Sequence, residues 1–278
     1  MVRKTTRRRL LSGGAAAALA SLAGCTGMTP FVGKREEGSR TVSIDDADAL
    51  AVDVDVGELT LRPADRGDVR IDYVRQASSV TADIGDLELR TERRDGRLVL
   101  ASEWTGEDTL FGGQPSLDLD VEIPRSLPVE RIAGSVGSID VRDVAGDLAV
   151  ETSTGSVTAA GVDGTVTVST STGSVDVRDP GALGDVSAST GSIDVEVPAI
   201  DGDTSVTAET GSIDVALASD LDLELRVRTG TGSVDVDLDG LPDADGVGSD
   251  PTVAATLGDG GPTLTVETDT GSVTVSRL

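Results

Sequence analysis

A short motif, Thr-Gly-Ser-Val-Asp-Val or a near variant, recurs through the second half of the chain. Its glycines are Gly137, Gly155, Gly173, Gly191, Gly211, Gly232 and Gly271, so successive copies lie 18, 18, 18, 20, 21 and 39 residues apart. A period of this length indicates a repeat architecture in which each unit packs on its neighbours. The long last step contains residues 237–262, which are rich in Asp, Gly and Pro and which we interpret as an insertion.

Polar and apolar residues alternate after each glycine, as in Ser174-Val175-Asp176-Val177, and again about nine residues later. Each repeat therefore holds two strands with one buried face. Such strands can bury that face by stacking on their copies in the next repeat, which predicts an all-β fold: a parallel β-solenoid of 18–21-residue coils over residues 136–278. The first expected core column is Val141, Ala159, Val177, Val195, Val215, Val236 and Val275, and the facing column is Val150, Val168, Val186, Val206, Val227 and Val266.

An antiparallel β-sandwich is the alternative fold, because nine-residue spacing with glycine turns also suits a meander. We favour the solenoid because the same Ser and Asp recur at fixed offsets. Residues 41–135 form a less regular β region, with an early copy of the motif at residues 56–61. This region is expected to close one end of the solenoid. The insertion, or a partner, is expected to shield the other end, where a terminal coil would leave backbone groups unpaired.

The repeats, together with Val-Glu-Ile-Pro at residues 121–124, resemble the bacterial and archaeal "putative adhesin" family. The resemblance covers about residues 41–278. It implies a β-strand-repeat domain of unknown function on cell-surface proteins. Because the family defines no catalytic residues, none carries over to this chain.

The first 24 residues have the composition of a signal peptide, with five basic residues and no acidic residue. The segment Thr6-Arg7-Arg8-Arg9-Leu10-Leu11 resembles a twin-arginine export signal in which Arg7 and Arg8 are the export pair. The apolar run that follows is shorter than the roughly 18 residues that a membrane-spanning helix needs. This segment is therefore predicted to be a signal and not an anchor.

Cys25, the only cysteine of the chain, follows Leu22-Ala23-Gly24 directly. These four residues resemble a lipobox, which predicts cleavage before Cys25 and lipid attachment to its sulfur. A diacyl group would supply the two-chain attachment that stable membrane anchoring needs. Residues 25–40 show no periodicity and are expected to be a linker from that anchor, which places the domain at the outer face of the cytoplasmic membrane.

Composition excludes several kinds of chemistry. The chain has no histidine, which excludes Ser-His-Asp catalysis and His-bound zinc, and one cysteine, which excludes an internal disulfide. Its 49 acidic and 23 basic residues leave a net charge of −26, so a nucleic-acid partner is not expected. The acidic residues are mostly Asp, and Lys34 is the only lysine after the signal, which resembles proteins of extremely halophilic archaea.

Two columns of polar side chains recur with the motif. An acidic ladder, Asp140, Asp176, Asp194, Asp214 and Asp235, is expected on the outward side of the strands. There it would attract monovalent cations non-specifically, because mid-strand carboxylates cannot gather the six or more oxygens that calcium needs. The serines that follow each glycine have no base nearby and are expected to be stacked hydroxyl groups. We therefore assign no catalytic, cofactor or metal residues.

These observations predict a lipid-anchored cell-surface protein that acts as an adhesion or binding module, or as a scaffold, with a surface glycan or a protein as ligand. It is not expected to be an enzyme. Two alternatives remain: an envelope regulatory component that docks another membrane protein, and a carbohydrate-active enzyme. The second requires paired carboxylates in distinct environments and usually aromatic platforms, and the repeats contain no aromatic residue.

Overall fold

The computed structural model describes residues 33–45, 47–78, 83–106, 114–238, 246–249 and 252–278, and the statements below concern these residues. The predicted signal peptide (1–24), the export pair Arg7 and Arg8, and Cys25 lie outside them. The chain divides into two units, residues 1–31 and 32–278, and all described residues belong to the second. No described helix is long and apolar enough to cross a membrane.

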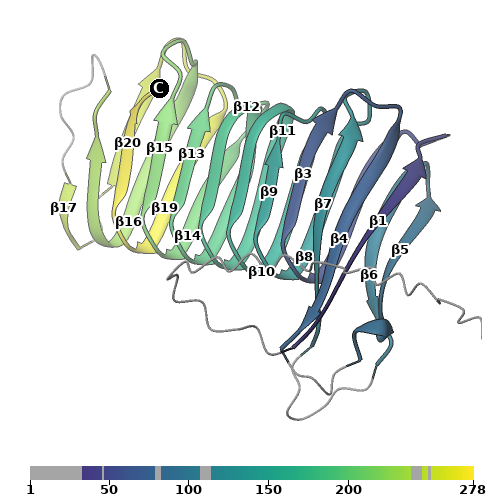
Figure 1. The fold of residues 1–278 in the computed structure, drawn as a ribbon. Coiled ribbons are helices and arrows are strands. Elements are labelled where there is room, and N and C mark those ends of the chain that lie inside the picture. The colour runs from purple at the N-terminus through teal and green to yellow at the C-terminus, as the bar shows by residue number, and fades with distance from the viewer. Residues whose placement is uncertain (1–32, 46, 79–82, 107–113, 239–245, 250–251) are drawn as a thin grey trace, which may run out of the picture. The chain divides into compact units, whose positions relative to one another are not determined.

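The chain winds alternately through two faces of strands, and this arrangement confirms the predicted parallel β-solenoid (Figure 1). Along face 1 the pairings are parallel from β7 to β16, whereas β1, β4 and β17 add antiparallel strands at the two ends. In spatial order face 1 consists of β1 (Lys34–Ser43), β4 (Asp68–Ala77), β7 (Ser116–Pro124), β3 (Leu59–Ala64), β9 (Ile139–Arg142), the first parts of β11 (Val157–Thr172) and β12 (Val175–Thr190), β13 (Ile193–Val197), β15 (Ile213–Leu217), β20 (Val273–Arg277), the second part of β16 (Leu223–Val236) and β17 (Gly246–Ser249).

Face 2 is parallel from β6 to β16 and ends in an antiparallel strand on each side. A single 3-10 turn, η1 (Ile84–Asp86), precedes it among the described residues. In spatial order face 2 consists of β5 (Leu87–Arg94), β6 (Arg97–Trp104), β2 (Ala49–Val56), β8 (Val129–Val136), β10 (Leu148–Thr154), the second parts of β11 and β12, β14 (Thr204–Thr210), β19 (Thr263–Thr270), the first part of β16 and β18 (Thr252–Leu257).

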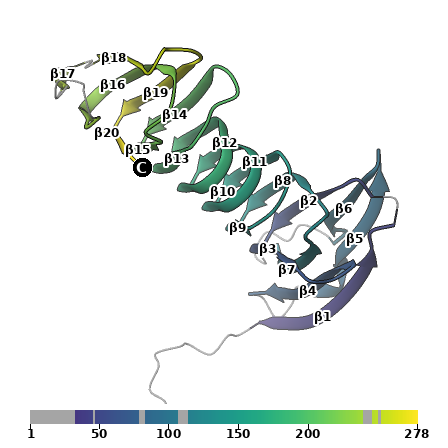
Figure 2. The same cartoon turned by 90° about the horizontal axis from the view of Figure 1, so that it is seen from above.

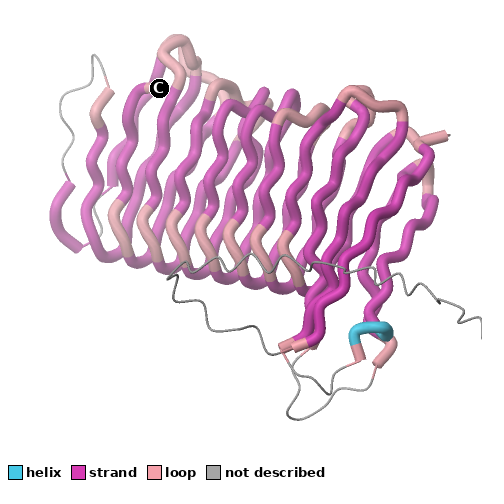
Figure 3. Tube along the Cα trace, in the orientation of Figure 1, coloured by secondary structure: helices cyan, strands magenta, loops and turns pink. Residues whose placement is uncertain are grey.

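The repeated glycines form one corner between the faces, and the corner loops stack in a row (Figure 3). Gly173 has φ +144°, and a Cβ atom there would lie 2.0 Å from the carbonyl oxygen of Gly155. The backbone N–H of Gly155 donates to Thr172 O at 2.8 Å, so each corner is hydrogen-bonded to the next. Glycine recurs at this position because a side chain would occupy the space of the neighbouring coil.

The two predicted core columns are present. Val177 pairs with Ala159 on one side and Val195 on the other, and Val168 pairs with Val150 and Val186 in the facing column. All six side chains are buried, with exposures of 0–1%. The Val-on-Val register explains the fixed offsets in the sequence, because each coil places the same inward residue over the one before it.

The order of the last coils differs from the order of the sequence. β19 and β20 lie between the coil of β14 and β15 and the coil of β16. Val275 therefore pairs with Val215 and Val236, and Val266 with Val206 and Val227. The expectation that each column keeps the order of the sequence is wrong for its last two members. After β16 the chain turns back, and β19 and β20 lie between the coil of β14 and β15 and the coil of β16.

Strands from the expected insertion cover the outermost coil. β18 pairs with the first part of β16, and β17 pairs with its second part, both antiparallel. β17 and β18 thereby cover β16 but become the outermost strands themselves, so the shielding of this end by residues 237–262 stays a prediction.

At the other end, the regular coils begin earlier than residue 136. β2 and β3 continue the parallel pairing of β8 and β9, and Gly57 has the corner conformation, with φ +146°. The early motif at residues 56–61 is thereby confirmed. Residues 34–40, which we expected within the linker, instead belong to β1, a strand whose many charges hide its periodicity (Figure 2).

Candidate binding face

The acidic ladder lies on the outward side of face 1, as the alternation predicts. Asp176, Asp194 and Asp214 occupy three adjacent strands and stand in register. Thr158 separates Asp176 from Asp140, and Thr274 separates Asp214 from Asp235. The ladder is therefore one run of three carboxylates with a single aspartate beyond each threonine, and the second interruption exists only because β20 lies between β15 and β16.

Two arginines that our sequence analysis did not single out compensate part of this charge. Arg178 donates to both carboxylate oxygens of Asp176, at 2.7 and 2.9 Å, and Arg142 binds Asp140 with the same two distances. Each arginine follows its aspartate by two residues and so lies on the same side of its strand. The repeated Asp-Val-Arg sequence was the signal that could have revealed these pairs.

Asp194, the middle carboxylate, lacks such a close partner, since Arg178 reaches it only at 3.8 Å. Partial burial and the neighbouring charges of Asp176 and Asp214 raise the pKa of Asp194. A carboxyl whose pKa is raised in the folded state favours folding when it is protonated. The ionised Asp194 therefore destabilises the domain at neutral pH, and this penalty disappears as the pH falls below the unfolded pKa.

We expect Asp194→Thr to raise the free energy of unfolding by up to about 1 kcal/mol at pH 7 and 0.1 M salt, because two carboxylates about 4.8 Å away no longer face a third. At molar salt, where the Debye length is about 3 Å, the gain should nearly vanish. Thermal melts at both salts and at pH 7 and pH 3 measure this. Asp176→Thr is the matched control and should give no gain, since it removes the two hydrogen bonds that Arg178 donates to Asp176. Destabilisation by Asp194→Thr would contradict the repulsion and point to a bound cation.

A groove of about 630 Å³ lies on the outward side of face 1, across β1, β4, β7 and β3. One row of groove residues follows from the strand register, in which Ser39 lies opposite Asp72, and Asp72 opposite Asp120. Val74 lies on the same outward side as Asp72, whereas the half-buried Tyr73 borders the groove and packs its ring against the core. Five carboxylates line it: Glu37, Glu58, Asp72, Asp118 and Asp120.

Hydrogen bonds hold several of these groove carboxylates in place. Asp118 accepts from the backbone N–H of Glu58 at 3.1 Å and from Gln76 Nε2 at 2.7 Å. The Ser39 hydroxyl, and secondarily Arg70, lower the pKa of Asp72. These contacts favour the ionised form of Asp72 and orient the carboxylate of Asp118, which suits a ligand that presents amine or hydroxyl donors.

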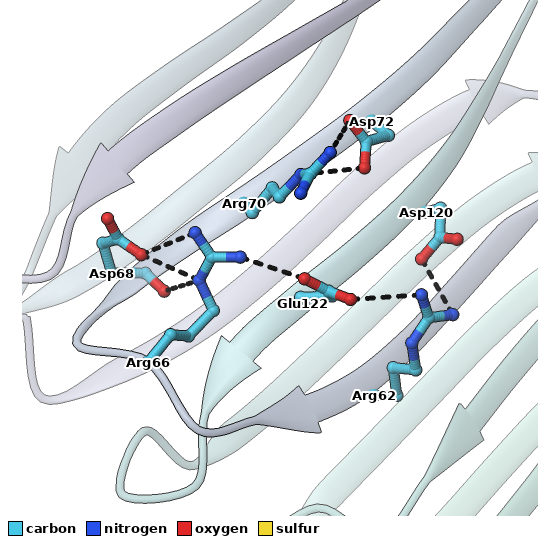
Figure 4. Close-up of polar contacts among 7 residues, drawn as sticks. All are labelled: Arg62, Arg66, Asp68, Arg70, Asp72, Asp120 and Glu122. Carbon is cyan, nitrogen blue, oxygen red and sulfur yellow. Dashed lines mark hydrogen bonds and ion pairs between the residues drawn. The ribbon is translucent and has the colours of Figure 1, made fainter.

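A series of linked ion pairs lies beside the groove, around the connection between β3 and β4 (Figure 4). Arg62 contacts Asp120 at 3.1 Å and Glu122 at 3.3 Å, and Arg66 contacts the other oxygen of Glu122 at 3.0 Å. The same side chain of Arg66 also pairs with Asp68 at 2.7 Å. These contacts join β7 to β3 and β4, which precede it in the sequence and follow one another directly.

Tyr73 lies against the backbone of the edge strand. A Cβ atom at Gly38 would come within 2.3 Å of the Tyr73 ring, so only glycine admits the ring there. The Arg75 guanidinium lies 5.2 Å from the ring centroid, within the range of a cation–π contact. Sequence analysis assigned no role to any groove residue, since the groove combines four strands whose pairing no local pattern reveals.

The serine column follows the glycine corner, and two of its members, Ser233 and Ser272, are joined by a hydrogen bond of 3.1 Å between their hydroxyl groups. Among the described residues, no group of three or more Asp, Glu, Cys or His side chains is placed to hold a metal ion. The arrangement of face 1 suits binding of a donor-rich ligand on a rigid surface.

Stacked corners, two alternating faces and an aliphatic core define a parallel β-solenoid repeat protein. The Toastrack DUF4097 family profile matches residues 116–276, more than half of the chain, and the chain belongs to this family. The predicted resemblance to an adhesin-like β-repeat domain is thereby confirmed at the level of the domain.

Solved structures with similar folds include a putative cell adhesion protein from Clostridium sporogenes and a putative adhesin from Bacteroides fragilis. The first is 12% identical, with a TM-score of 0.38 and coverage of 88% of this chain and 100% of that chain. The second is 10% identical, with a TM-score of 0.42 and coverage of 87% and 97%. No curated protein matches the chain.

Proposed function

We propose that this protein is a lipid-anchored binding or scaffold module, exported through the twin-arginine route and held at the outer face of the cytoplasmic membrane. The anchor proposal rests on Cys25, the only thiol, which follows Leu22-Ala23-Gly24 and the basic export segment. The large acidic excess supports a setting of high salt, as in halophilic archaea. The Toastrack domain supplies the displayed surface.

The groove across β1, β4, β7 and β3 is the observation that carries the binding role. Its volume of about 630 Å³ lies within the range of small-ligand sites, and its floor belongs to paired strands rather than to loops. Carboxylates beside the apolar side chain of Val74 favour a ligand with hydroxyl or amine donors on an apolar body, such as a surface glycan or a basic protein segment.

Capture of partners from native membranes at native salt tests this role. Thr60 lies in the groove, and Thr158 occupies the same outward column two strands away, beyond Asp140. The wild-type chain and Thr158→Arg should capture the same partner, and Thr60→Arg should lose it. Equal capture by both variants would contradict a ligand in the groove. An integral membrane protein as the partner would favour the regulatory role over adhesion.

The anchor is tested separately. Cys25→Ser should leave the chain unprocessed or released from the membrane, because no other thiol can carry the lipid. Replacement of Arg7 and Arg8 by lysine should block export. Lipid labelling and cell fractionation measure both effects. Unchanged labelling of Cys25→Ser would refute the lipobox, and normal export of the lysine variant would indicate the general secretory route.

A further inference from the structure

The two ends of the solenoid present different strand edges. At the amino-terminal end the outermost strands are β1, paired with β4, and β5, paired with β6. Five of the ten residues of β1 and five of the eight of β5 are charged. Charged side chains on an edge strand oppose the addition of another strand, so this end is protected against association.

The carboxy-terminal end lacks this protection. Its outermost strands, β17 (Gly-Val-Gly-Ser) and β18 (Thr-Val-Ala-Ala-Thr-Leu), contain no charged residue, although 26% of the chain is charged. Within the described part of the chain, each of them pairs with β16 alone. Both therefore offer a free, uncharged edge of backbone donors and acceptors.

The aliphatic core is incompletely buried at this end. Val206, Val266 and Val227 follow one another in register and are fully buried. Val253 of β18 continues this column beyond Val227, but it is only half-buried, and so is Ala255 on the same side of the strand. Another strand on β18 would complete the burial of both residues.

We propose that a second copy of this chain binds there, with β18 antiparallel to β18 about a two-fold axis at Ala254. This register pairs Val253 with Ala255 of the other copy on the core side and Thr252 with Thr256 on the outward side. A two-fold axis normal to face 2 keeps the core side of the two β18 strands continuous.

A second copy fits this end better than an unrelated strand. β17 and β18 each run antiparallel to β16. The edge of such a strand can pair with the same edge of a second copy through a two-fold rotation. The surrounding charge sets the conditions for binding: both copies are strongly acidic, so association is expected to strengthen with salt as their repulsion is screened. This inference does not depend on the lipid anchor or on the groove.

Disulfide capture tests the register directly. In the full chain with Cys25→Ser, Ala254→Cys should form a cross-linked dimer under mild oxidation, because directly opposite Cα atoms lie about 5 Å apart, within disulfide reach. Glu92→Cys, on the outermost strand of the opposite end, is the matched control and should not cross-link. Equal cross-linking at both positions, or none at Ala254→Cys, would overturn the proposal.

Sedimentation of the full chain at about 50 μM, in 0.2 M and 3 M KCl, supplies the second measurement. The wild-type chain should sediment as a dimer, more completely at 3 M. Ala254→Lys places a charge on an exposed outward position and should be monomeric while it keeps the β-sheet circular dichroism of the wild-type chain. Thr41→Lys, an exposed position on β1, should remain dimeric. A monomeric wild-type chain, or a dimer that persists in Ala254→Lys, would refute the proposed edge.

Discussion

Replacing Gly173 by alanine is expected to lower the free energy of unfolding by about 2–6 kcal/mol. The residue has φ +144°, which is costly for any side chain, by about 1–3 kcal/mol. Its Cβ atom would also lie 2.0 Å from Gly155 O, and overpacking of this kind adds about 1–3 kcal/mol. The sum is a large part of the 5–15 kcal/mol that stabilises a whole domain.

Gly202→Ala is the matched control for this prediction. A Cβ atom at Gly202 meets nothing within 4 Å, and its φ lies outside the left-handed region, so its effect should stay within about 0.5 kcal/mol. Denaturant unfolding of both variants at high salt gives the comparison. Equal stability of the two variants would mean that the corners are looser than the stacked geometry requires.

Deleting residues 263–278 is expected to unfold more of the domain than the deleted coil alone. The deletion removes β19 and β20, which pair on both sides, so β16 loses its parallel neighbours on both faces. β16 and β18 should then lose amide-exchange protection down to the level of unstructured segments, because the deletion removes every parallel neighbour of β16 in the described structure.

The coils from β8 to β12 are the internal control and should keep their protection in the truncated chain. If the coils followed one another in sequence order, the deletion would remove only the outermost coil, and residues 223–236 would stay protected. Hydrogen exchange measured by mass spectrometry separates these outcomes. Retained protection of β16 would contradict the position of β19 and β20 between the coils.

Much of the fold was predictable because it is local and periodic. Alternation places Val177 inward and Asp176 outward, and the 18-residue step places Val177 on Ala159 and Val195. The glycine of each corner is equally visible, since no other residue tolerates its φ and its contact with the next coil. Repeat proteins are predictable in this way because each unit contacts only its neighbours.

The candidate groove was not predictable by the same reasoning. Asp72, Tyr73 and Asp118 come from β4 and β7, where the repeat is irregular and the pairing is antiparallel. Gly38 lies in a strand whose charges resemble those of a linker. No local pattern shows which of these strands are neighbours, so neither the groove nor the ion pairs of Arg62 and Arg66 could be placed.

The sequence by itself determined the solenoid, its corners, the two core columns and the outward direction of the acidic ladder, because each depends on the residue types at fixed spacing within one or two coils. Only the tertiary structure decided the order of the last coils. Val236 and Val275 present the same side chain to the same column, so their exchange changes no local pattern. Long-range strand pairing, set by the path of the chain after β16, selects between the two orders and thereby decides which edge the protein exposes.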